Sequence, residues 1–171
     1  MIDVHAYYVS PALLEAARGR GLPMSYDPGT RVLNFPSRKS RPVPPLLTGL
    51  EDRSAWMRTP SIERQVLSAW MDIAGYDGEP AQASAWCRLQ NDTVADDLRS
   101  HPWSSAFSTL PVVSGEDAAA ELVRAVWELG FVGGAVQTQI KGLDLDEAGL
   151  DPLFESAEML GAPHYSSTRF G

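Results

Sequence analysis

Short apolar runs alternate with longer amphipathic stretches along the chain. Residues 2–9 form a run rich in β-branched and aromatic side chains, which predicts a buried strand. Three shorter runs predict further strands, at 65–68, 106–110 and 132–140. Four amphipathic stretches predict helices, at 51–57, 81–100, 114–129 and 151–161. A fifth strand is expected to begin after Pro163.

Local signals mark where several helices begin and end. Ser10 followed by Pro11 predicts an N-cap and the first residue of a short helix. Ser114 is the expected N-cap of the clearest helix, and Gly130 is its expected C-terminal cap. In the helix at 51–57, Trp56 and Met57 are the side chains expected to be buried.

Residues 19–50 interrupt this order with a long segment rich in Gly, Pro, Ser and Arg. We expect it to be a loop and hairpin excursion over the surface of a single domain that spans residues 1–171. The sequence Asp27-Pro28-Gly29 predicts a turn, and the weak alternation at 31–35 predicts one arm of a hairpin after it. Excursions of this length are often functional, and a disordered segment is the alternative.

The order of the elements predicts an α/β fold. Strands that alternate with helices form right-handed βαβ units, and these units build a parallel sheet. We therefore expect four to five parallel strands with helices outside them. The chain has no glycine-rich phosphate fingerprint, so a dinucleotide site of the Rossmann type has no support.

Composition restricts the class of function. Fourteen Lys and Arg against 22 Asp and Glu give the 171-residue chain a formal net charge of −8. A nucleic acid or an anionic membrane is an unsuitable partner for such a chain. The single Cys excludes an intramolecular disulfide framework. No basic leader and no apolar run long enough to span a membrane are present, so we expect a cytoplasmic protein.

The first predicted strand carries the most informative side chains. Residues two apart on a strand face the same way, so His5 and Tyr7 are expected to point inward together near its carboxyl end. Parallel α/β sheets and barrels place their active sites at that end. Two imidazoles at this spacing would indicate a metal site, whereas a tyrosine is a poor zinc ligand at neutral pH. A histidine that only hydrogen-bonds within the core is the alternative.

Three other side chains lie at the expected ends of later strands. Trp70 and Asp72 follow the second strand, and Thr138 falls near the end of the fourth. Each is a candidate to line a substrate pocket, and an ordinary role in anchoring a loop is the alternative. Cys87 lies on a helix face without a catalytic partner at a suitable spacing, which favours a core position.

Several segments together resemble the amidohydrolase superfamily, and in particular the aminocarboxymuconate-semialdehyde decarboxylase group. The resemblance runs from residue 2 to about residue 163 through six segments: IDVHAYYVSPALLEAA (2–17), RQVLSAW (64–70), AWCRLQND (85–92), STLPV (108–112), ELVRAVWELGFVGGAVQT (121–138) and LDPLFESAEMLGAP (150–163). It implies a (β/α)8 barrel of the TIM type, of which this chain is the amino-terminal half. It also implies a divalent metal, usually zinc, and decarboxylation of an aromatic or muconate-type carboxylic acid.

The resemblance carries over few site residues. His5 matches the first ligand of the family's His-x-His pair, and Tyr7 stands at the second ligand position. Ser167 falls about where the family has a further histidine ligand on its fifth strand. Relatives also use an arginine from the excursion for a substrate carboxylate, and Arg31, Arg38 and Arg41 all lie in that segment. Solvated surface charge is the alternative for each of them.

Two readings of the chain follow. The first is a half-barrel related to metal-dependent decarboxylases or hydrolases, inactive alone, with a frameshift near Pro163 as the expected origin of its short length. The second is a non-catalytic half-barrel subunit or small-molecule-binding domain. Both leave strand edges and an inner face uncovered. We therefore expect a homodimer or an association with a missing carboxyl-terminal half.

Overall fold

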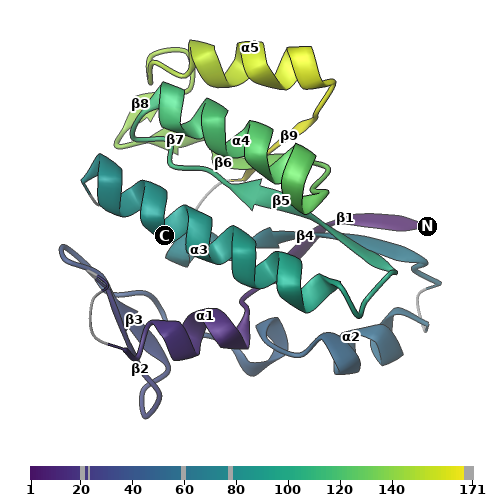
Figure 1. The fold of residues 1–171 in the computed structure, drawn as a ribbon. Helices are drawn as coiled ribbons and strands as arrows, with labels where there is room; N and C mark the ends of the chain where they lie inside the picture. The colour runs from purple at the N-terminus through teal and green to yellow at the C-terminus, as the bar shows by residue number, and fades with distance from the viewer. Residues whose placement is uncertain (20–21, 23, 59–60, 77–78, 168–171) are drawn as a thin grey trace.

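The computed structural model has a five-stranded parallel sheet at its centre (Figure 1). It describes residues 1–19, 22, 24–58, 61–76 and 79–167, without the side chains of 165–167. The strands lie in the order β1-β4-β5-β6-β9. Their bounds are Ile2–Tyr8, Arg64–Ala69, Ser104–Thr109, Gly133–Gln137 and His164–Ser167. All four pairings are parallel, which confirms the predicted α/β class and the partial barrel.

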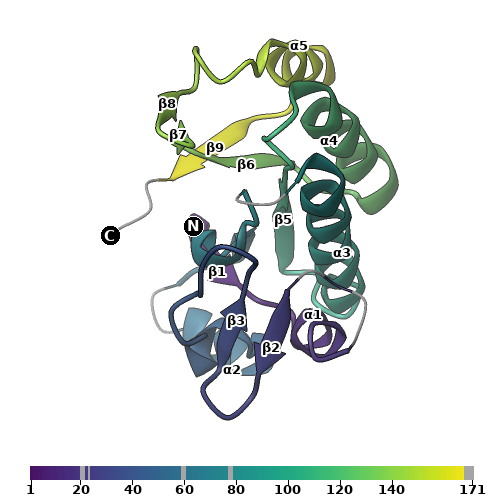
Figure 2. The same ribbon diagram turned by 90° about the vertical axis from the view of Figure 1, so that its left-hand side faces the viewer.

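Helices cover the outer face of the curved sheet. Figure 2 shows α3, α4 and α5 side by side along this face, with α1 and α2 at the other end of the molecule. The bounds are α1 Pro11–Ala16, α2 Leu50–Met57, α3 Pro80–Leu98, α4 Gly115–Leu129 and α5 Asp151–Leu160. Each predicted helix is present within two residues of its expected bounds.

The predicted caps of α1 and α4 are confirmed. Ser10 Oγ accepts a hydrogen bond from the Leu13 amide, and Ser114 Oγ accepts one from the Asp117 amide. Gly130 adopts a left-handed φ of 71° after α4, the conformation that a helix-ending glycine supplies without strain.

The two faces of the sheet have different neighbours. Side chains of the outer face pack under the helices, as Leu67 does with Leu50, Val94 and Leu98. Those of the inner face form a separate apolar cluster across the strands: Tyr7, Val66, Met71, Phe107 and Ala135. Apart from the partly buried Tyr7, the members of this cluster are buried. The inner face is thus less exposed than the sequence suggested.

The segment 19–50 folds against the body of the protein. Strands β2 (Ser25–Asp27) and β3 (Val32–Asn34) form the predicted hairpin, and a short 3-10 helix, η1 (Pro45–Leu47), follows. Leu33 and Val43 are fully buried, in a core shared with Leu13 and Trp86. The hairpin is as expected, but the segment does not only run over the surface, because its apolar side chains join a core that includes Leu13 and Trp86.

The fourth predicted strand is shorter than its apolar run. β6 ends at Gln137, and the chain then bends into a small antiparallel hairpin of β7 (Gln139–Ile140) and β8 (Leu143–Asp144). The turn of this hairpin is Lys141-Gly142, both at positive φ. The prediction of a single strand through residue 140 is therefore wrong at its carboxyl end.

Gly133 allows β9 to approach β6. A Cβ at this position would collide with the carbonyl oxygen of Pro163, the residue before β9. A glycine weakens a strand because its backbone is flexible. Here that cost is offset, because a residue with a Cβ would keep β9 from lying this close to β6.

Asn91 of α3 fixes the carboxyl end of β5. Its Oδ1 accepts from the Thr109 amide at 2.8 Å, and its Nδ2 donates to the Thr109 carbonyl at 2.9 Å. The same Nδ2 lies 2.6 Å from Oε1 of Glu121, a buried carboxylate that also accepts from Arg124. This network joins α3, α4 and the sheet. Within the described residues, no helix is long and apolar enough to cross a membrane.

Candidate active site at the carboxyl ends of the strands

The first strand carries a bulge that determines which side chains face inward. Asp3 pairs with Gln65 and Ala6 with Leu67, so β1 advances three residues where β4 advances two. Asp3 accepts from the His5 amide at 3.0 Å and from Gln65 Nε2 at 2.7 Å. The extra residue leaves Asp3 and Ala6 on the same side of the strand.

His5 and Tyr7 lie together on the other side of β1. Nε2 of His5 is 3.3 Å from the Tyr7 hydroxyl, and the two rings meet edge to face with centroids 5.3 Å apart. Tyr7 belongs to the inner-face cluster, whereas His5 is exposed. The shared inward orientation expected from their spacing is therefore found.

Trp70 and Asp72 lie at the carboxyl end of β4 and are buried. Asp72 accepts from the Arg41 amide at 3.2 Å, from Arg41 Nε at 2.8 Å and from Arg41 Nη2 at 3.2 Å. The Arg41 guanidinium also lies 5.4 Å from the centre of the Trp70 ring. The hydrogen bonds that Arg41 donates to the Asp72 carboxylate raise the pKa of Arg41.

A second arginine joins the segment 19–50 to the same loop. Nη1 of Arg38 donates to the Asp72 carbonyl at 2.7 Å, and its guanidinium lies 4.4 Å above the Phe35 ring. Asp72 thus receives arginine donors on both its carboxylate and its backbone. In this structure it anchors the 19–50 segment, and its role in a substrate pocket stays a prediction.

Thr138 lies in the bend between β6 and β7, partly exposed. The preceding Gln137 donates from Nε2 to the Met71 carbonyl at 3.4 Å, which brings the end of β6 to the loop after β4. Met71 and Tyr7 both belong to the inner-face cluster. The structure therefore brings the ends of β1, β4 and β6 to one rim.

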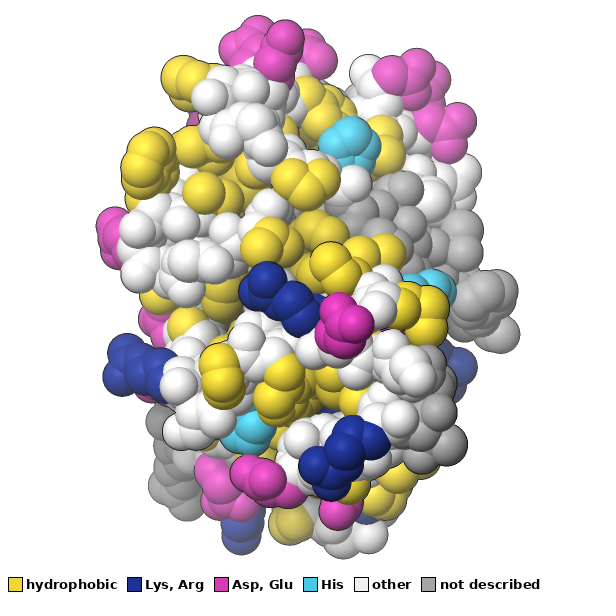
Figure 3. All heavy atoms as spheres, turned by 90° about the vertical axis from the view of Figure 1, so that its right-hand side faces the viewer, with side chains coloured by type: hydrophobic (Ala, Val, Ile, Leu, Met, Phe, Trp, Pro, Cys, Tyr) yellow, Lys and Arg dark blue, Asp and Glu magenta, His cyan; other side chains and the backbone are white. Residues whose placement is uncertain are grey.

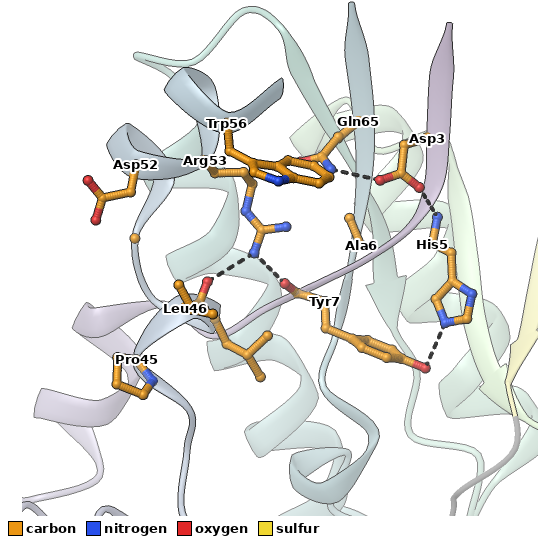
Figure 4. A pocket seen from close by; sticks show the side chains of 12 residues that line it. Asp3, His5, Ala6, Tyr7, Pro45, Leu46, Asp52, Arg53, Trp56 and Gln65 are labelled. Carbon is orange, nitrogen blue, oxygen red and sulfur yellow. Dashed lines mark hydrogen bonds between the residues drawn. The ribbon is translucent and has the colours of Figure 1, made fainter. Parts of the chain in front are cut away.

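A pocket of about 420 Å³ lies along the outer edge of β1. Figure 4 shows it between this strand, the η1 turn and α2, with Trp56 and Arg53 on the helix side and Asp3, His5 and Tyr7 on the strand side. Nη2 of Arg53 donates to the Tyr7 carbonyl at 2.7 Å. Burial lowers the pKa of Arg53.

Sequence reasoning did not identify this pocket, and it placed Trp56 incorrectly. Trp56 was expected in the core, but its side chain is 55% exposed and lines the pocket. Met57, the next residue, is buried as expected. The helical period alone does not distinguish a core-facing tryptophan from one that borders a groove. The sequence also does not show that Leu46, on the turn across the pocket from Trp56, is exposed.

The described residues do not make a complete metal site. Among them, no group of three His, Cys, Asp or Glu side chains is close enough to hold one ion. At the second ligand position, Tyr7 lies 3.3 Å from Nε2 of His5, and the buried carboxylate of Asp72 is bound to Arg41. Ser167 ends β9, but its side chain lies outside the described part of the chain.

Comparison with known proteins defines the class of protein. A family model described as Amidohydrolase matches residues 2–168, and the chain belongs to this family. It is 31% identical over 144 residues to gamma-resorcylate decarboxylase from Polaromonas sp., across 80% of this chain and 43% of that protein. It is 32% identical over 102 residues to 2-amino-3-carboxymuconate-6-semialdehyde decarboxylase from Dictyostelium discoideum, across 59% of this chain and 28% of that protein. The predicted resemblance is confirmed.

Solved structures show the same arrangement. A dihydroxybenzoic acid decarboxylase from Polaromonas sp., solved with manganese and the inhibitor 2-nitroresorcinol, superposes with a TM-score of 0.72 at 26% identity. The superposition covers 99% of this chain and 49% of that one. A 5-carboxyvanillate decarboxylase from Novosphingobium aromaticivorans, also with manganese, gives 0.73 at 22% identity over 96% and 49% of the two chains. The chain therefore spans about half the length of these structures, and less than half of the curated relatives.

Proposed function

We propose that this chain is one half of a divalent-metal-dependent carboxy-lyase barrel for aromatic carboxylic acids, and that residues 1–171 alone do not catalyse the reaction. The similarity to gamma-resorcylate decarboxylase over 80% of the chain is the observation that carries the substrate class. The parallel sheet, with the ends of β1, β4 and β6 at one rim, supports the architecture.

In this proposal, His5 is the histidine of the first strand that this half offers to a metal. Relatives were solved with manganese, so manganese and zinc are both metals to test. Tyr7 does not supply a second imidazole, and its hydroxyl lies 3.3 Å from Nε2 of His5. The described residues alone do not fit a metal centre, so the missing ligands would have to come from outside them.

Within this half, the remaining residues would bind and orient the substrate. The Arg41 side chain is 59% exposed while its Asp72 partner is buried, so the guanidinium reaches solvent near the carboxyl end of β4. Trp70 under this guanidinium and Thr138 at the end of β6 are the other residues that we propose to line the pocket. A fixed cation at this rim suits an aromatic carboxylate.

The test is an assay of the purified chain with 2,6-dihydroxybenzoate. Carbon dioxide release is measured with Mn²⁺ or Zn²⁺ added, and metal binding is measured in parallel by calorimetry. We expect no turnover above buffer and no stoichiometric metal binding, with an intact gamma-resorcylate decarboxylase as the positive control. Turnover that requires metal and is lost in His5→Ala would contradict the proposed inactivity.

A second candidate is a non-catalytic small-molecule-binding half-barrel. The pocket of about 420 Å³ beside β1 favours it, because this volume lies within the range of small-ligand sites. Ligand-observed NMR with aromatic acids, in the absence of any metal, distinguishes the two candidates. Saturable binding that Trp56→Ala removes, without any turnover, would favour the binding domain.

A further inference from the structure

A second cavity lies at the opposite end of the sheet from the rim. Its volume is about 320 Å³, which is within the range of small-ligand sites. It is lined by residues at the amino ends of β4 and β5, at the carboxyl ends of α3 and α4, and in the turn that leads into β6. Figure 3 shows this end of the molecule, where basic side chains stand among hydrophobic ones.

The walls of this cavity do not depend on the edges of the sheet. β4 lies between β1 and β5, and β5 lies between β4 and β6, so both strands have a neighbour on each side. Ala106 of β5 packs in one cluster with Val94 of α3 and Ala125 of α4. None of the described residues that line the cavity belongs to β1 or β9. The cavity is therefore built by the interior of the sheet and by the two helices that cover it.

The floor of the cavity is apolar. Ala106 and Phe131 are buried and belong to one hydrophobic cluster, which Leu98 and Leu129 join as partly buried members. All four residues line the cavity. Burial of a ligand's hydrocarbon part on such a surface is favourable in proportion to the apolar area that it removes from water. The floor therefore suits an aromatic ring or a short hydrocarbon chain.

The mouth of the cavity carries positive charge and a hydroxyl group. Arg64 and Arg99 both line it and are exposed, and Ser105 beside them is partly buried. Arg99 forms an ion pair with Asp96 at 2.9 Å, whereas Arg64 has no ion pair with another described residue. A guanidinium binds a carboxylate through two parallel N–H donors, and a serine hydroxyl can donate a third hydrogen bond. The polar groups of the mouth therefore suit a carboxylate.

The carboxyl ends of α3 and α4 oppose the binding of an anion. The last carbonyl groups of a helix together carry about half a negative charge. Here the Leu98 carbonyl accepts from the His101 amide at 2.9 Å, and the Ala125 carbonyl accepts from the Phe131 amide at 3.0 Å. Carbonyl groups that are paired in this way present less negative potential to a ligand, while the Arg64 guanidinium carries a full positive charge. The charge of Arg64 therefore decides the preference.

We propose that this cavity binds a small apolar carboxylate, with its hydrocarbon part against Phe131 and its carboxylate on Arg64 and Ser105. A ligand with only the charge leaves the floor unused, and a neutral ligand forms no ion pair with Arg64. The site is separate from the rim, because the six residues of β4 set the two roughly 17 Å apart. This inference goes beyond the proposed function, and it is tested without any measurement of turnover.

An NMR titration of the isotope-labelled chain with benzoate tests the proposal. We expect saturable chemical-shift changes at the amides of Ser105 and Phe131. Benzamide has the same ring without the charge, and inorganic phosphate has charge without the ring, so each should bind about tenfold more weakly than benzoate. Arg64→Gln should raise the Kd for benzoate about tenfold. Arg18→Gln is the matched control and should leave the Kd unchanged, because Arg18 follows α1 and does not line the cavity.

The positions of the shifted amides separate this proposal from the proposed function. Shifts at Ser105 and Phe131 would support the second site even if benzoate did not bind at the rim. Shifts confined to the rim around Arg41 and Trp70 would support the proposed function and overturn the second site. An absence of saturable shifts at Ser105 and Phe131 would overturn it as well. So would equal affinities for benzoate and for benzamide or phosphate, or a Kd that Arg64→Gln leaves unchanged.

Discussion

The ion pair between Asp72 and Arg41 is expected to hold the 19–50 segment against the sheet. Replacing Asp72 by alanine removes the acceptor of three hydrogen bonds from Arg41, two of them from the charged guanidinium. Breaking a fully buried pair costs about 3–5 kcal/mol. Arg41 is 59% exposed and can be hydrated once its partner is lost, so we expect about 3 kcal/mol for Asp72→Ala.

The matching change, Arg41→Ala, should cost about 2 kcal/mol, because it leaves a buried carboxylate with fewer donors. If the two residues act mainly on each other, the double variant should cost about 3.5 kcal/mol, a coupling of about 1.5 kcal/mol. In a chain of this length, each kcal/mol corresponds to about 2–4 °C in Tm.

Urea unfolding followed by tryptophan fluorescence measures these differences, and proteolysis of the 19–50 segment should accelerate in parallel. Arg18→Ala is a suitable control, since its ion pair with Glu15 is exposed on both sides and should contribute less than about 0.5 kcal/mol. Equal losses for Asp72→Ala and Arg18→Ala would refute the anchoring role. A gain in stability on removal of Asp72 would instead favour a strained, ligand-binding carboxylate.

Other variants test the packing of the sheet and the state of the buried thiol. Gly133→Ala should lower the free energy of unfolding by more than about 2 kcal/mol, because the added Cβ would push β6 and β9 apart. Gly130→Ala, at a positive φ with open space around it, should lower it by only about 1 kcal/mol through backbone strain. Equal losses in urea unfolding would contradict this account. Asn91→Ala should cost about 2–4 kcal/mol, since the backbone groups of Thr109 lose both partners, and hydrogen exchange at that amide should accelerate. Burial raises the pKa of Cys87, so the folded thiol stays protonated at a pH where the unfolded one ionises. The contribution of this thiol to stability is therefore fully present below about pH 8.5 and should fall as the pH rises above it. A thiol reagent should react with Cys87 only as fast as the chain unfolds.

Periodicity and caps predicted the framework of the fold because these signals act locally. The caps at Ser10 and Ser114 depend on hydrogen bonds within three residues, and Gly130 acts through its own backbone angle. The alternation that placed His5 beside Tyr7 also operates within one strand. Such features do not depend on what lies elsewhere in the chain.

The errors arose where distant segments decide the outcome. Trp56 is exposed because the turn at Leu46 borders a groove instead of covering the ring. The segment 19–50 has a core because Leu33 and Val43 meet Leu13 and Trp86, far away in sequence. Asp72 was identified as a candidate site residue, but nothing in its neighbours predicted the arginine 31 positions earlier that binds it. Neither the composition of the chain nor the spacing of its residues predicts these contacts.

The bulge in β1 has a consequence for how this part of the chain can change in length. Because one extra residue lies between Asp3 and Ala6, its loss would make the strand regular and leave Tyr7 opposite Ser68. The start of the chain can therefore gain or lose a residue at this point while the side chains at the rim keep their orientation. An insertion after Tyr7 is not absorbed by a bulge, so the side chains that follow it in the strand would switch to the opposite face of the sheet. We expect length variation among relatives to collect on the amino-terminal side of His5.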